Sequence, residues 1–231
     1  MPWRGLGITN WVVIAIVIAV IAFMIPRLHS VCGPPSRRSV CMNNLRQIGV
    51  GCRQYSLDYG DYFPTVRAPG GESRPLASLA LLYDNYLQQP RLFTCPSTED
   101  DCSDLQVGKT IEPHSYKKVP GDDRRCSYAY DDTRDMKADP GIVIAGDAPP
   151  TMKRYDDLRQ RRFWESKRAV PPEGFSEKNS DNHRGIGQNV LFFAGNVKWT
   201  NRTENPEIRG DDIYTAADPK NPGANDSYIY Q

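Results

Sequence analysis

Residues 11–25 read WVVIAIVIAVIAFMI, and residues 36–59, beyond a joint with two prolines, read SRRSVCMNNLRQIGVGCRQYSLDY. The first run has no charged or polar side chain, and its extension back to Ile8 brings it close to the roughly 20 residues that cross a bilayer. A secretory signal peptide is the alternative, but it would have an apolar core of about 7–15 residues and a cleavage site between small residues. The sequence therefore predicts a retained transmembrane segment over about 8–25.

The second run carries one apolar stripe at helical spacing. Its members follow in alternating steps of four and three residues: Cys41, Leu45, Ile48, Cys52, Tyr55 and Tyr59. Gly49 and Gly51 each lower helix propensity by up to about 1 kcal/mol, so they require a packing reason such as the close approach of a strand. We therefore expect a long N-terminal helix, with a membrane half and then an amphipathic half packed on a small antiparallel sheet.

The rest of the chain is long enough for one domain of ordinary size. We expect an anchor and joint over 1–35 and an α+β domain over 36–231, with a proline-rich, charged excursion over about 148–182. Apolar spacing and turn residues indicate an amphipathic helix over Leu76–Leu87, strands at Arg91–Cys95, Cys126–Tyr130 and Gly141–Ala145, and a β-hairpin of Asn189–Phe193 and Val197–Thr200.

Six cysteines behind an export-like N-terminus favour an oxidising compartment. No two have the C-x-x-C spacing of a zinc or redox site. We expect a disulfide between Cys41 and Cys95, and a second between Cys102 and Cys126; free buried thiols are the alternative. The positive charges after the apolar run favour a cytoplasmic domain instead, but large domains can cross a membrane despite such charges. We therefore expect the domain on the outside.

The formal net charge of +1 gives no reason to expect a nucleic-acid partner, and we expect none. Enzyme motifs are also missing, because the chain has no G-x-S-x-G, no H-E-x-x-H and no phosphate-binding glycine loop. Of three histidines, His183 alone merits a mechanistic role, since Asp147, Asp181 or Asp211 could approach it. A structural histidine bonded to the hairpin backbone is the simpler interpretation.

Two blocks resemble the large family of type IV pilin-like, pseudopilin-like proteins. The first, CMNNLRQIGVGCRQYSLDYGDYFP over 41–64, contains Asn44, Leu45, Gln47, Ile48 and Gly49; the second, NHRGIGQNVLFFAGNVKW over 182–199, contains His183, Asn189 and Gly195. The family has a prepilin-type N-terminus and a C-terminal histidine followed, after about nine or ten residues, by Asp-Gly. Here Ala194 replaces that aspartate, although Gly195 and the asparagine after it can still form a tight turn.

The resemblance implies a non-enzymatic, membrane-anchored subunit or accessory component of a type II secretion or type IV pilus-like machine. Its site would be the bacterial inner membrane, with one span and a periplasmic domain. Its partners would be the lipid bilayer and other pilin-like subunits or secretion-machine components. Prepilin peptidase would cut between Gly7 and Ile8, but the glutamate that the family has at mature position five is missing.

No cofactor or metal is expected; calcium at Asp211 and Asp212 is a minor possibility, by analogy with the major pseudopilins of type II secretion. Two other functions remain open. One is a membrane-tethered binding module that does not assemble and uses exposed aromatics of the excursion, Tyr155, Phe163, Trp164 and Phe175. The other is a periplasmic hydrolase that uses His183 with a carboxylate.

Overall fold

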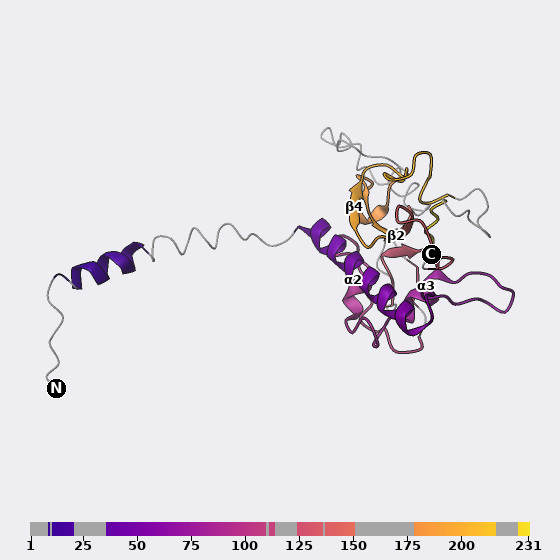
Figure 1. The fold of residues 1–231 in the computed structure, drawn as a ribbon, viewed down its shortest axis with the longest axis horizontal. Coiled ribbons are helices and arrows are strands. Elements are labelled where there is room, and N and C mark those ends of the chain that lie inside the picture. The colour runs from indigo at the N-terminus through magenta and orange to yellow at the C-terminus, as the bar shows by residue number, and fades with distance from the viewer. Residues whose placement is uncertain are drawn as a thin grey trace. The chain divides into compact units, whose positions relative to one another are not determined.

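The computed structural model describes residues 9, 11–20, 36–109, 111–113, 124–135, 137–150, 178–215 and 226–231. The chain divides into two units, Met1–Ser36 and Arg37–Gln231. In the first unit, residues 11–20 form a helix (Figure 1). Their side chains are exposed.

The predicted long N-terminal helix, with its membrane half, is wrong. Among the described residues, no helix is long and apolar enough to cross a bilayer. This finding contradicts the predicted transmembrane segment, the single-pass topology and the inner-membrane and periplasmic location.

The second unit is α+β, and its first element is the helix α2 (Arg37–Asp58). The stripe residues Cys41, Leu45, Ile48 and Cys52 are fully buried, as their spacing predicts. The helix packs on the sheet, mainly on its third strand. A Cβ at Gly49 would lie 3.0 Å from a methyl group of Leu191 on that strand, so the expected packing reason for this glycine is confirmed.

Four strands form one antiparallel sheet in the order β1-β2-β3-β4. They are β1 (Tyr128–Tyr130), β2 (Val143–Asp147), β3 (Gln188–Phe192) and β4 (Val197–Thr200). Side chains alternate between two faces, as in any strand. On β3, Leu191 joins the core under α2, whereas Val190 and Phe192 join a second cluster with Ile213 and Ile229 of the C-terminal segment. Both faces of the sheet are therefore covered.

The predicted hairpin is confirmed by the pairing of β3 with β4, and Gly195 occupies its turn with φ +92°. Two other local predictions are wrong. The expected strand at Arg91–Cys95 begins instead as a 3₁₀ helix, η1 (Pro90–Phe93), because Pro90 fixes a helical φ at its first position. The expected helix over Leu76–Leu87 is only α3 (Pro75–Ala80), and Asp84 downstream has a positive φ.

The start of β3 allows no side chain at Gly187. A Cβ there would lie 2.4 Å from the Thr200 carbonyl oxygen and 2.7 Å from the Trp199 ring. We expect Gly187→Ala to lower the free energy of unfolding by about 1–3 kcal/mol, because the backbone of β4 would have to move. Urea unfolding measures the change. The matched control is Gly70→Ala, where nothing lies within 4 Å; an equal loss in both variants would contradict the prediction.

Candidate functional site

Four side chains from separate segments meet beneath α2. Cys41 comes from α2, Cys95 follows η1, Asp147 ends β2, and His183 ends the 3₁₀ helix η2 (Asp181–His183). One ligand atom from each residue can be chosen so that all four lie within 4.8 Å of one another. We call these four residues the buried cluster. Three of them are at most 1 % exposed and His183 is 9 % exposed.

Asp147 is the centre of the buried cluster, because both of its carboxylate oxygens accept several hydrogen bonds. Oδ1 accepts from the Cys41 thiol at 2.9 Å and from Asn182 Nδ2 at 2.9 Å. Oδ2 accepts from the Asn189 backbone N–H at 2.6 Å and from Asn189 Nδ2 at 3.2 Å, and it lies 3.2 Å from His183 Nε2. The carboxylate therefore connects α2, η2 and β3.

His183 uses a single ring nitrogen towards the buried cluster. Nε2 faces Asp147 Oδ2 at 3.2 Å, Cys95 Sγ at 3.8 Å and Asn189 Nδ2 at 3.2 Å. In a nucleophile–histidine–carboxylate relay, the two partners bind opposite ring nitrogens. Here the thiol and the carboxylate share one nitrogen, so the geometry does not form such a relay.

Burial and mutual contacts shift the pKa values of the buried cluster. The contacts with Cys41 and His183 lower the pKa of Cys95 to about 6, against the effect of burial. Burial lowers the pKa of His183, but Asp147 and Cys95 outweigh it and raise the value to about 10. Burial likewise raises the pKa of Asp147, yet its hydrogen bonds with His183 and Cys41 leave it lowered. Charge is thus stabilised on these three groups.

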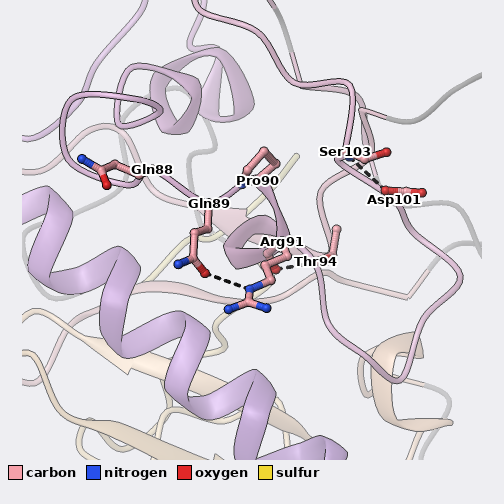
Figure 2. A pocket seen from close by; sticks show the side chains of 7 residues that line it. All are labelled: Gln88, Gln89, Pro90, Arg91, Thr94, Asp101 and Ser103. Carbon is pink, nitrogen blue, oxygen red and sulfur yellow. Dashed lines mark hydrogen bonds between the residues drawn. The ribbon is translucent and has the colours of Figure 1, made fainter.

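A pocket of about 550 Å³ lies beside the start of η1 (Figure 2). Its lining is polar and has neither histidine nor cysteine: Gln88, Gln89, Pro90, Arg91, Thr94, Asp101 and Ser103. Figure 2 shows Arg91 and Gln89 joined by a hydrogen bond of 2.8 Å, with Asp101 and Ser103 on a separate loop. The Ser103 backbone N–H donates to Asp101 Oδ1 at 2.9 Å.

The motif residues from the sequence lie in two places. Asn44 donates to the Thr94 carbonyl at 2.9 Å and so ties α2 to the end of η1, whereas Gln47 is exposed. Asn189 on β3 contacts His183 through its side chain, so the expected bond from His183 to the hairpin backbone is replaced by a side-chain contact. Of the three candidate carboxylates, Asp147 is the one that faces His183.

The cysteines that we expected to pair are free thiols in the structure. Cys41 and Cys95 are nevertheless neighbours in the buried cluster, and Cys102 lies near enough to Cys126 to influence its pKa. The two disulfides, Cys41–Cys95 and Cys102–Cys126, stay predictions.

Other predicted features are untested. Gly7, Ile8 and the aromatics Tyr155, Phe163, Trp164 and Phe175 lie outside the described residues. Asp211 already accepts hydrogen bonds from Asn205 and the Ser227 backbone, and Asp212 accepts from Thr203 and the Tyr214 backbone. Calcium at these carboxylates also stays a prediction.

The sequence predicted two pairs of the buried cluster, Cys41 with Cys95 and His183 with one of three carboxylates, but it did not predict that the two pairs meet. Cys41 and Asp147 are 106 residues apart, and Cys95 and His183 are 88 apart, so no short motif contains them. The available signals were that Cys41 sits on the buried stripe and that Asp147 ends an otherwise apolar strand.

Comparison of the chain with protein-family models, with curated proteins and with solved structures gave no match. The resemblance to pilin-like proteins therefore stays a prediction from the two sequence blocks.

Proposed function

We propose that the chain is a non-enzymatic structural or accessory subunit of the pilin-like kind, which associates with further subunits through its N-terminal apolar segment. The helix over residues 11–20 carries the proposal. It contains only apolar side chains, and they are exposed on all sides. Burial of one Val or Ile side chain is worth about 1.5–3 kcal/mol, so association that covers several of them is strongly favourable.

The buried cluster supports a structural rather than a catalytic role for the domain. Its groups are closed off by α2 and the sheet, and Cys95 and Asp147 bind the same nitrogen of His183. A general base must reach the proton of a substrate, either directly or through one water. His183 does face a carboxylate, as the hydrolase alternative requires, but the burial of the pair favours the structural role.

We expect Ile18→Asp to abolish association of the full-length chain. Ile18 is exposed within the apolar helix, and a charge there must be desolvated wherever helices pack together. Sedimentation velocity over a range of protein concentrations measures the effect: the unmodified chain forms multimers and the variant sediments as a monomer.

The matched control is Val50→Asp, which adds the same charge at an exposed apolar residue of α2. It should associate like the unmodified chain. A monomeric unmodified chain at every concentration would overturn the proposal and favour the binding module that does not assemble.

A further inference from the structure

The buried cluster combines two thiols, one imidazole and one carboxylate, which are the donor types that Zn²⁺ takes in proteins. We propose that Cys41, Cys95, Asp147 and His183 bind one Zn²⁺ ion in a closed, structural site. Among the described residues, these four are the cysteine, histidine and acidic side chains whose ligand atoms lie close enough together to hold a metal ion. The inference goes beyond the proposed function and does not depend on it.

The distances between the donor atoms fit a tetrahedral ion. With Zn–S near 2.3 Å and Zn–N and Zn–O near 2.0–2.2 Å, neighbouring donors are about 3.3–3.8 Å apart. In the structure, His183 Nε2 lies 3.2 Å from Asp147 Oδ2 and 3.8 Å from Cys95 Sγ. Cys41 Sγ is closer to the other carboxylate oxygen, Asp147 Oδ1, at 2.9 Å. If that oxygen is the ligand, it and the sulfur would separate by about 0.7 Å on binding.

Neighbouring side chains contact the four donor residues, as outer-shell residues do around a bound metal. Outer hydrogen bonds orient ligating side chains and hold them in place. Asn182 and Asn189 donate to the Asp147 carboxylate, and the Tyr128 hydroxyl donates to Cys41 Sγ at 3.4 Å. The edge of the Trp199 ring packs against His183, with ring centroids 5.2 Å apart. Each ligand except Cys95 thus has a neighbour that fixes its orientation.

Two buried oxygen atoms of this shell also favour a bound group at the cluster. Asn182 Oδ1 and Asn189 Oδ1 have no hydrogen-bond partner among the described residues, although both side chains are fully buried. Buried acceptors without partners are rare in folded proteins and commonly mark an ion or water.

Metal binding is a simple exchange at this site. The thiol of Cys41 and the Nε2–H of protonated His183 each lose a proton to solvent. The Cys41 sulfur then binds Zn²⁺ instead of donating to Asp147, His183 binds through the freed nitrogen, and Cys95 binds as a thiolate. No electron is transferred. A disulfide between the two sulfurs would use both thiols and leave Asp147 without one of its donors. Metal binding and disulfide formation at Cys41 and Cys95 therefore exclude each other.

The test uses the full-length chain, kept reduced, with Zn²⁺ alone as the ligand. Elemental analysis after dialysis should give one Zn²⁺ per chain, and Co²⁺ in its place should give the visible absorption of tetrahedral cobalt with thiolate-to-metal charge transfer. Cys41→Ser and His183→Ala should each lower the affinity by at least about 100-fold, since loss of a ligand exceeds the 10- to 100-fold effect of outer-shell changes.

The matched control is Cys52→Ser, which changes a fully buried cysteine of the same helix outside the buried cluster. It should keep one Zn²⁺ per chain. The cobalt spectrum of the unmodified chain decides the matter even if the ligand variants fail to fold. The proposal is overturned if the reduced chain binds no stoichiometric Zn²⁺, if cobalt shows no thiolate charge transfer, or if Cys52→Ser loses the metal as Cys41→Ser does.

Discussion

Replacement of Asp147 by alanine is expected to lower the free energy of unfolding by about 3–5 kcal/mol, because it removes one partner of a buried charged pair. The methyl group cannot accept the hydrogen bonds from Cys41, Asn182 and Asn189 that converge on the carboxylate. Each buried donor left without an acceptor costs about 1–3 kcal/mol. His183, whose pKa Asp147 raises, also loses its counter-charge.

Urea unfolding in the presence of a chelator measures this loss without any contribution from a metal. The matched control is Asp135→Ala, whose carboxylate accepts one exposed hydrogen bond from the Lys137 backbone. We expect the control to lose about 1 kcal/mol or less. Similar losses in the two variants would show that the hydrogen bonds of Asp147 contribute little.

Leu45→Ala is expected to cost about 2–5 kcal/mol, the range for buried leucines whose removal leaves a cavity. Leu45 is 0 % exposed and lies in the middle of the α2 stripe, where the helix meets the sheet. Alanine favours helix formation slightly more than leucine, so the loss would come from packing alone.

Leu57→Ala on the same helix provides the comparison. Leu57 is 80 % exposed, so its truncation should change stability by no more than about 0.5 kcal/mol. Equilibrium unfolding of the three proteins under one condition gives both values. If both leucines proved equally dispensable, α2 would not be packed on the sheet in solution.

The elements that the sequence predicted well are those with a local signal. The α2 stripe repeats at helical spacing, so the burial of Cys41 and Leu45 followed directly from the pattern. The β3–β4 hairpin combines apolar runs with a Gly-Asn turn. Even the unfavourable Gly49 was informative, because only a close strand could justify it.

Local signals failed where two structures compete for the same residues. The apolar run over 8–25 has the composition of a membrane helix, but among the described residues no helix is long and apolar enough to cross a bilayer. Pro90 suits the first turn of a helix as well as the edge of a strand, and the helix prevailed. The buried cluster gave no local signal, because its four donors meet only after the sheet has formed.

The position of α2 in the chain has a consequence for synthesis and folding. Within the second unit α2 is the first element to be synthesised, yet its main support, β3, begins only at Gln188. At about 5–20 residues per second, the ribosome needs on the order of ten seconds to make the chain between them. Throughout that interval the apolar stripe of α2 lacks its main native surface, although η1, which also contacts α2, is made earlier. Contacts of such long sequence separation also form slowly. A nascent or truncated chain that ends before β3 is therefore a substrate for chaperones and proteases, and α2 is the segment that they would hold.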